Sequence, residues 1–256
     1  MTKKHLITCS VMLVVVIISA FDLSNATVVK RPSVAQNAAR FALIEAPNEE
    51  AAGFSFADED LPENSKRVNR KLNYSLRMHS YTKVQSNILH IKAEKLFPVI
   101  EPILEEYGIP EDFKYIPLVE SGLREGTSRK GARGPWQFMP GTARSFGLKV
   151  GNKKDERLNL RKSTVAACKY LNELFDEFGS WTLAAAAYNN GSIRIVKAMH
   201  KQNEDNYFRM RLNRETGMYV YKLVAMKEVI ENPEKYGYDE LMAQVLFHPA
   251  NLMAFN

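Results

Sequence analysis

The spacing of apolar residues predicts a chain that is helical over most of its length. From about Val68 onward, apolar side chains recur every three or four residues, as in an amphipathic helix, and almost no stretch alternates as a half-buried strand would. The pattern therefore predicts an all-α fold with minimal β-structure. The helices that it predicts cover residues 81–96, 98–107, 113–121, 142–146, 163–178, 182–188, 192–200 and 215–230.

The first 26 residues have the pattern of a secretory signal peptide. Lys3 and Lys4 precede an apolar run from Leu6 to Phe21, and small residues up to Ala26 offer a cleavage site. The run is shorter than the roughly 20 residues that a membrane-spanning helix needs. We therefore expect export across the inner membrane, to the periplasm or cell envelope. Retention as an N-terminal membrane anchor is the less favoured alternative.

The rest of the chain divides into a linker, one domain and a short extension. Residues 27–67 show no sustained period, contain three prolines and end in an acidic stretch, so we expect a flexible linker. The helical pattern occupies residues 68–232, which is enough for one domain with a sizeable core. Residues 233–256 are partly apolar and form a C-terminal extension whose place the sequence does not determine.

Composition and charge narrow the classes of function. The full chain of 256 residues is 45% hydrophobic and carries a net charge of +6, with basic residues spread along it rather than gathered in a nucleic-acid motif. This excess suits an anionic partner without identifying it. The five histidines lack the pair spacing of a metal site, so we expect no metal. Cys168 lies on an apolar helical face and is expected to be a buried thiol.

Glu120 is the first candidate for chemistry. On a helix over residues 113–121 it follows Phe113 and Ile116 along one stripe, which directs its carboxyl group toward apolar surroundings. It also lies in the last turn, where the helix dipole presents its negative end. Both effects disfavour the carboxylate, so we expect a raised pKa, as a general acid requires. A glutamate paired with a nearby arginine is the purely structural alternative.

The segment Gly131–Pro140 has the composition of a sugar-binding loop. It combines glycines with Trp136, Gln137, Phe138 and Met139. Flat apolar side chains stack on sugar faces, and amides bridge hydroxyl and N-acetyl groups. The structural alternative is a tight turn whose two aromatic residues belong to the core.

Two later segments place polar side chains beside close-packed helices. The run Ala184–Ala187 allows another backbone to approach closely, and the polar ends of Tyr188 and Asn189 follow it. The Gly191 turn has a structural explanation, but those two polar side chains do not. Tyr219 lies on the apolar stripe of the last predicted helix, where a tyrosine is more often a core residue.

Together these segments resemble the goose-lysozyme-like lytic transglycosylases related to the soluble lytic transglycosylase catalytic domain, and within them the membrane-bound type D group. The resemblance spans roughly residues 68–232 and implies a lysozyme-like helical domain with a catalytic cleft. Members of the type D group commonly carry wall-binding repeats after this domain, and none is recognised in the sequence up to Asn256. The motifs that carry the resemblance, in the order of the family, are Glu120-Ser121, Gly131–Pro140, Ala187–Gly191 and Glu215–Val220.

The resemblance implies a role for each motif residue. Glu120 would act as general acid and then as base, in a cleavage between N-acetylmuramic acid and N-acetylglucosamine that uses no water and leaves a 1,6-anhydromuramoyl end. It also implies that no cofactor is needed and that the partners are peptidoglycan glycan strands. We expect a monomer that binds no nucleic acid, with at most a loose association with membrane or wall. The residues assigned to substrate binding are Ser121, Gln137, Phe138, Met139, Tyr188, Asn189 and Tyr219.

Two alternatives to this function stay open. A lysozyme of the same fold would use water, and would need a second carboxylate across the groove. The candidates for that carboxylate are Glu125, Glu173 and Glu215. A wall-binding scaffold would keep the groove without turnover, although the presence of Glu120 speaks against it.

Overall fold

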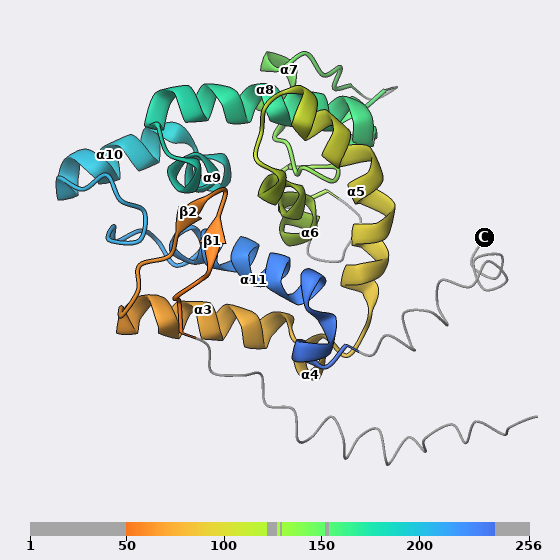
Figure 1. The fold of residues 1–256 in the computed structure, drawn as a ribbon. Helices are drawn as coiled ribbons and strands as arrows, with labels where there is room; N and C mark the ends of the chain where they lie inside the picture. The colour runs from red at the N-terminus through yellow and green to blue at the C-terminus, as the bar shows by residue number, and fades with distance from the viewer. Residues whose placement is uncertain (1–49, 122–126, 129, 152–153, 239–256) are drawn as a thin grey trace, which may run out of the picture. The chain divides into compact units, whose positions relative to one another are not determined.

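The computed structural model describes residues 50–121, 127–128, 130–151 and 154–238. These residues are mainly helical, which confirms the predicted fold class (Figure 1). Within these ranges no helix is both long and apolar enough to cross a membrane. The helices and strands are β1 (Ser55–Phe56), β2 (Glu59–Asp60), α3 (Lys66–His79), α4 (Tyr81–Val84), α5 (Ile88–Glu106), α6 (Ile116–Ser121), α7 (Pro140–Ser145), α8 (Leu160–Phe178), α9 (Trp181–Asn190), α10 (Ser192–Gln202) and α11 (Tyr219–Glu231), with 3-10 turns η1 (Glu111–Tyr115), η2 (Glu156–Leu158), η3 (Thr216–Met218) and η4 (Pro233–Tyr236).

The predicted linker is wrong for residues 50–67, which belong to the folded domain. β1 and β2 form an antiparallel hairpin, and the side chains of Phe56 and Leu61 are fully buried. The carboxylate of Glu59 accepts hydrogen bonds from the hydroxyl groups of Ser180 (2.9 Å) and Thr182 (2.6 Å) at the start of α9. A negative charge is favourable at a helix N-terminus. Strands of two residues are too short to show the alternation that would reveal them in the sequence.

The predicted break at Pro98 is also wrong. Pro98 and Pro102 lie inside α5, which continues through both of them to Glu106. Both prolines are exposed and stand four residues apart, so the backbone donors that they lack are missing from one solvent-facing side. Burial of the opposite face compensates for this loss. The buried residues of that face are Leu89, Ala93, Ile100, Ile103 and Leu104.

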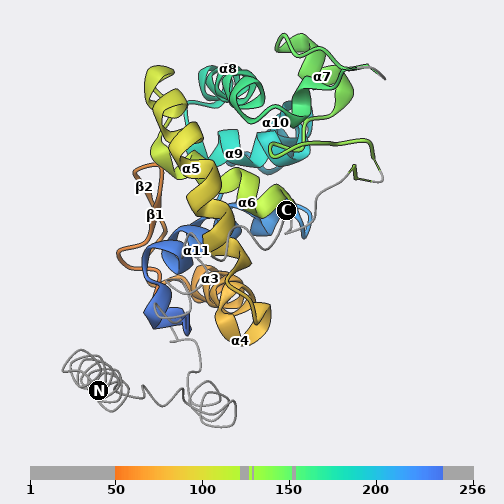
Figure 2. The same ribbon diagram turned by 90° about the vertical axis from the view of Figure 1, so that its right-hand side faces the viewer.

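The core is formed where α9 is packed between other helices. The side chains of Ala184–Ala187 are fully buried, and α9 packs against α8, α10 and α11. Alanines allow this close approach because they have no atoms beyond Cβ. Cys168 on α8 is buried as predicted, and burial raises the pKa of its thiol to about 12. In the second view, α8 and α9 lie above α11 and α3 (Figure 2).

The folded domain continues beyond residue 232 into the predicted extension. η4 buries Tyr236, and Tyr238 is buried as well. The ring of Tyr238 contacts those of His90 (4.4 Å between centroids) and Tyr81 (5.5 Å). Residues 233–238 are therefore part of the domain, and the rest of the predicted extension lies outside the described residues.

Candidate active site

Glu120 lies near the end of α6 and is partly buried. The hydroxyl of Tyr219, from the first turn of α11, donates a hydrogen bond of 2.7 Å to its Oε1 atom. Burial raises the pKa of Glu120, as its inward-facing position predicted. The hydrogen bonds from Tyr219 and from the Asn189 side chain oppose that increase because they stabilise the carboxylate. The carboxyl group therefore combines the raised pKa of an acid with two donors that can support its charged form.

The orientation of Asn189 is fixed by a hydrogen bond from a third segment. The Thr216 hydroxyl donates to Asn189 Oδ1 at 3.0 Å, and it accepts from Asn213 Nδ2 at 3.0 Å. Because Oδ1 of Asn189 is occupied by this donor, the amide N–H group remains for Glu120. Thr216 is itself almost completely buried, with 1% of its surface exposed. The η3 turn thus positions a side chain of α9 against the carboxyl group of α6.

Tyr188 connects this cluster to the glycine-rich loop. Its hydroxyl donates to the backbone carbonyl of Trp136 at 2.8 Å. Burial is the main reason that the pKa of Tyr188 is well above its ordinary value, and the negative charge of Glu120 contributes to it. Tyr188 therefore stays a neutral donor that holds the loop next to the acid.

The loop places its predicted contact residues in three different environments. Met139 is 42% exposed, as a side chain that contacts substrate would be. Gln137 has a left-handed backbone (φ 47°), and its amide donates to the Gly134 carbonyl at 2.8 Å. Phe138 and Trp136 are buried, at 3% and 0% exposure. Both rings pack on Tyr188, so these two aromatic residues support the loop from beneath.

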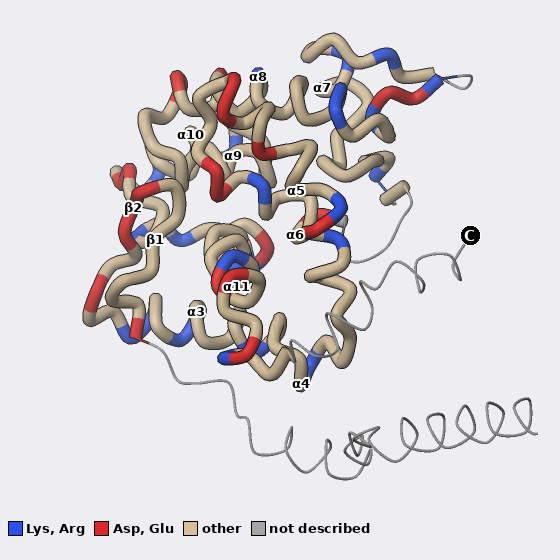
Figure 3. Tube along the Cα trace, turned by 45° about the vertical axis from the view of Figure 1, so that its right-hand side comes forward, with Lys and Arg blue, Asp and Glu red and all other residues tan. Residues whose placement is uncertain are grey.

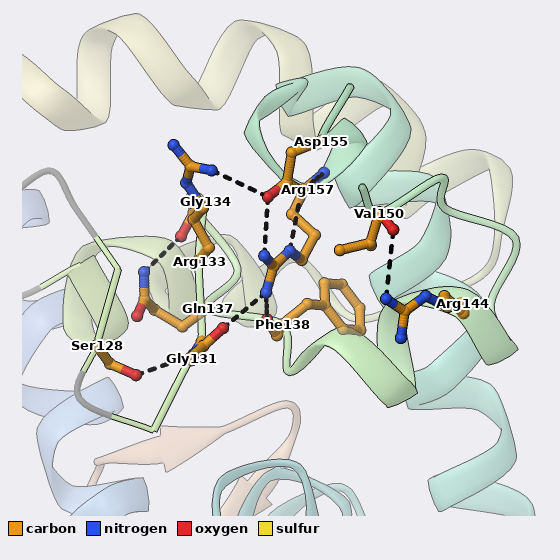
Figure 4. A network of polar contacts seen from close by, with 11 residues as sticks. Ser128, Gly131, Arg133, Gly134, Gln137, Phe138, Arg144, Val150, Asp155 and Arg157 are labelled. Atoms are coloured by element: carbon orange, nitrogen blue, oxygen red, sulfur yellow. Dashed lines mark hydrogen bonds and ion pairs between the residues drawn. The ribbon is translucent and has the colours of Figure 1, made fainter. Parts of the chain in front are cut away.

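Arg157 connects the loop to η2, the 3-10 turn that precedes α8 (Figure 4). Its guanidinium group donates to the carbonyl oxygens of Gly131 (2.7 Å) and Phe138 (2.9 Å), and to the carboxylate of Asp155 (2.8 Å). The arginine holds the pKa of Asp155 low, at about 2. Gly134 approaches the backbone of Arg157 so closely that a Cβ atom would lie 1.9 Å from the carbonyl oxygen. The loop shape therefore requires a glycine at this position.

Of the two candidates for a second carboxylate that lie in the described residues, Glu173 and Glu215, only Glu215 has a charge that acts on Glu120. Glu215 is exposed at the start of η3, and its negative charge adds to the increase in the pKa of Glu120. Lys222 on α11 has the opposite effect. Glu173 is exposed on α8, and its charge is felt by Tyr170 instead. Glu125 and the side chain of Ser121 lie outside the described residues.

The sequence prediction missed three residues that surround this site. Thr216 and Asn213 orient Asn189, and the charge of Lys222 acts on the acid. Thr216 lies within one of the four motifs, Glu215–Val220, but the sequence did not indicate that it orients Asn189. Lys222 follows Tyr219 by three residues, which places both on neighbouring positions of one helical face. That spacing is the only sequence signal that could have identified it.

Known proteins resemble the segment that holds this site. Residues 99–210 match the family described as Transglycosylase SLT domain. The chain is 32% identical over 185 residues to membrane-bound lytic murein transglycosylase D of Escherichia coli strain K12 and of Escherichia coli O6:H1 strain CFT073. The aligned part covers 69% of this chain and 39% of those proteins. A protein of Alteromonas sp. (strain M-1) named for tributyltin chloride resistance is 32% identical over 110 residues, 42% of this chain and 53% of that one. The chain thus spans 39% of the length of the lytic transglycosylases that it matches.

Proposed function

We propose that the protein is a peptidoglycan lytic transglycosylase in which Glu120 is the catalytic acid and base, and the match of residues 99–210 to the Transglycosylase SLT domain family supports this proposal. The observation that carries the proposal is the buried carboxyl group of Glu120, whose pKa is raised and which accepts a 2.7 Å hydrogen bond from Tyr219. A general acid must hold its proton near the pH at which it works. Burial gives Glu120 that property.

In the first step, protonated Glu120 gives its proton to the glycosidic oxygen between N-acetylmuramic acid and N-acetylglucosamine. The bond from that oxygen to C1 of the muramic acid breaks, and its electron pair goes to the oxygen. Glu120 is then a carboxylate. The hydrogen bonds from Tyr219 and Asn189 stabilise this charge.

In the second step, the Glu120 carboxylate takes a proton from the C6 hydroxyl of the same muramic acid. The oxygen of that hydroxyl forms a bond to C1, which gives a 1,6-anhydro ring and restores the protonated acid. No water is consumed, so the muramoyl product is lighter by one water than the product of hydrolysis. One carboxyl group is enough for this sequence because the substrate supplies its own nucleophile, whereas ordinary glycosidases use two.

Met139 is the substrate contact that its exposure supports best. Gln137, Tyr188 and Asn189 shape the site around it, and Phe138 supports the loop from the core. We propose peptidoglycan strands as the partner and the cell envelope as the location, since the matched Escherichia coli protein is named a membrane-bound murein transglycosylase.

The test is the chemistry of the released ends. Purified peptidoglycan is digested with the protein and with the variant Glu120→Gln, and the muropeptides are identified by mass spectrometry. Anhydro ends from the protein and none from the variant are expected. Reducing ends would assign the protein to the lysozymes and make Glu215 the first candidate for the second carboxylate. No release from either protein, with binding to the wall retained, would indicate a scaffold.

A further inference from the structure

The outward side of α3 is strongly basic. Five of its 14 residues are Lys or Arg, and none is Asp or Glu. A second basic segment lies beside it, since the guanidinium group of Arg67 donates a hydrogen bond to the backbone carbonyl of Arg209 at 3.4 Å. The segment from Arg209 to Arg214 adds three arginines and no acidic residue. The two segments form a surface that we name the basic face, with the cations Lys66, Arg67, Arg70, Lys71, Arg77, Arg209, Arg211 and Arg214.

The cations of the basic face have no carboxylate partner within the described residues. The ion pairs found there join other residues. The two half-buried cations, Arg67 and Lys71, donate to backbone carbonyls instead, and Lys71 reaches that of Gly217 at 2.7 Å. Burial and the nearby charges of Arg67 and Arg70 lower the pKa of Lys71 to about 8. The basic face therefore holds positive charge that an external anion can neutralise.

Two exposed apolar side chains lie among these charges. Tyr74 is 43% exposed and Met78 is 46% exposed, and because they stand four residues apart they lie on one stripe of α3. At about 100° of rotation per residue, this stripe lies between Arg70 and Arg77 on one side and Lys71 on the other. Tyrosine and flexible apolar side chains between cations are typical of a surface that contacts an anionic lipid bilayer. The cations attract the headgroups, and the apolar side chains enter between them.

The position of α3 in the domain favours contact with a membrane. Figure 1 shows α3 along one edge of the domain, with α11 on its inner side and with α7 and α8 at the opposite edge. The turned view in Figure 2 keeps α3 and α7 at opposite edges, and Figure 3 shows Lys and Arg positions along α3. A bilayer against α3 would therefore leave α7, at the end of the glycine-rich loop, facing away from the lipid.

The chain enters the folded domain against the same helix. The backbone N–H group of Ala51 donates to the Asn69 side-chain oxygen on α3 at 3.1 Å. The apolar run from Leu6 to Phe21 lies upstream of this point. Whenever that run is held in a membrane, during export or as an anchor, α3 is the first long helix of the domain that follows it.

We propose that the basic face docks the domain on an anionic phospholipid surface, with Arg70 and Arg77 pairing with headgroups and with Tyr74 and Met78 entering between them. The wall also carries anionic groups, but the proposed wall contact, Met139, lies at the start of α7, at the opposite edge of the domain. This docking goes beyond the proposed function, because it does not depend on the catalytic role of Glu120.

Binding to lipid vesicles tests the proposal. The protein without its predicted signal segment, residues 27–256, keeps every described residue and is the form expected after export. It is titrated with vesicles of pure phosphatidylcholine, and with vesicles of equal parts phosphatidylcholine and phosphatidylglycerol. Bound protein is measured by co-sedimentation. We expect binding to the mixed vesicles that weakens as salt is added, and little binding to the neutral ones. Equal binding to both kinds of vesicle would overturn the proposal.

A pair of charge substitutions locates the contact. Arg70→Gln combined with Arg77→Gln should weaken binding to the mixed vesicles about 25-fold, since each cation at an anionic surface contributes roughly fivefold. The matched pair Arg161→Gln and Lys169→Gln removes the same charge from exposed positions of α8 and should bind normally. Equal losses in the two pairs, or no loss in the α3 pair, would overturn the proposal.

Two further measurements separate a membrane from the other possible partners of a basic surface. Tyr74→Ser combined with Met78→Ser keeps the charge and should also weaken binding to the mixed vesicles, and unchanged binding would contradict this mode of docking. The α3 charge pair should bind purified sacculi normally, whereas a loss as large as that for vesicles would assign the basic face to the wall and overturn the proposal. All four side chains are exposed, so the melting temperatures should stay unchanged. Release of anhydro ends tests the proposed function separately.

Discussion

Replacement of Gly134 by alanine should disconnect the glycine-rich loop from α8. Gly134 has a left-handed backbone (φ +81°), and an added Cβ would lie 1.9 Å from the carbonyl oxygen of Arg157. Backbone atoms cannot rotate away as a side chain can. The two segments must therefore separate by about 1 Å to reach the shortest contact that real Cβ atoms show.

The size of the effect follows from the bonds that this separation breaks. Arg157 donates to the Gly131 and Phe138 carbonyls at 2.7 and 2.9 Å, and an increase of about 1 Å exceeds hydrogen-bond range for both. Hydrogen bonds to a charged group contribute about 1.5–3 kcal/mol each. Together with the left-handed backbone, which costs about 1–2 kcal/mol for alanine, the loss of both hydrogen bonds should lower the unfolding free energy of the variant by at least about 4 kcal/mol.

Two other glycines of the same region allow the cost of the steric clash to be separated from the cost of the left-handed backbone. Gly131 has φ +90° but no close neighbour, so Gly131→Ala should cost only the backbone term of about 1–2 kcal/mol. Gly141 has neither a left-handed backbone nor a neighbour within 4 Å, and alanine there should be neutral or slightly stabilising. The free energy of unfolding is measured by urea denaturation. If Gly134→Ala loses no more than Gly131→Ala, the steric argument is refuted.

Three further predictions concern Glu120 and its partners. Tyr219→Phe removes a hydrogen-bond donor to the carboxylate, so the pKa of Glu120 should rise further. The alkaline limb of the pH–rate profile should then move to higher pH. An alkaline limb at the same pH as in the natural protein would contradict this prediction. Thr216→Val should lower kcat about tenfold, because it removes one hydrogen bond of about 1.4 kcal/mol. Thr216→Ser keeps the hydroxyl group and should have a nearly normal kcat. Equal losses of kcat in both variants would mean that the packing of Thr216, and not its hydrogen bond, matters. Glu120→Gln should melt at a higher temperature than the natural protein at pH 7, because the folded state holds a proton that the unfolded chain releases once the pH exceeds the ordinary pKa of glutamate. This advantage should shrink as the pH is lowered toward that value, and a difference independent of pH would count against it.

The sequence predicted best those features that depend on local periodicity. The stripe of Phe113, Ile116 and Glu120 indicated an inward carboxyl group, and the raised pKa of Glu120 from burial confirms that direction. Helices with strong apolar repeats, such as α8, were also predicted within a few residues of their bounds. Local spacing could place these features because neighbouring turns of one helix determine them.

Features that depend on distant segments were not visible in the sequence. Thr216 and Asn189 are 27 residues apart, and only the packing of α9 against η3 brings them together. Phe138 illustrates the same limit. The composition of its loop suggested that it contacts a sugar, whereas the fold places its ring against those of Tyr170 and Tyr188. The continuity of α5 through two prolines likewise depends on burial against α8, which outweighs the local preference.

The surroundings of Glu120 have two opposite effects on its pKa, which suits a residue that acts first as an acid and then as a base. Burial is the largest influence on its pKa and favours the acid, while Tyr219 and Asn189 are both oriented as donors and favour the carboxylate. Burial alone would hold the proton too strongly to leave a usable base after the first step. Donors alone would leave a carboxylate with no proton to give. Because Thr216 occupies the acceptor atom of Asn189, the amide cannot turn its oxygen toward Glu120 without breaking the hydrogen bond to the buried Thr216. The two opposing influences on Glu120 therefore follow from the packing of η3 against α9.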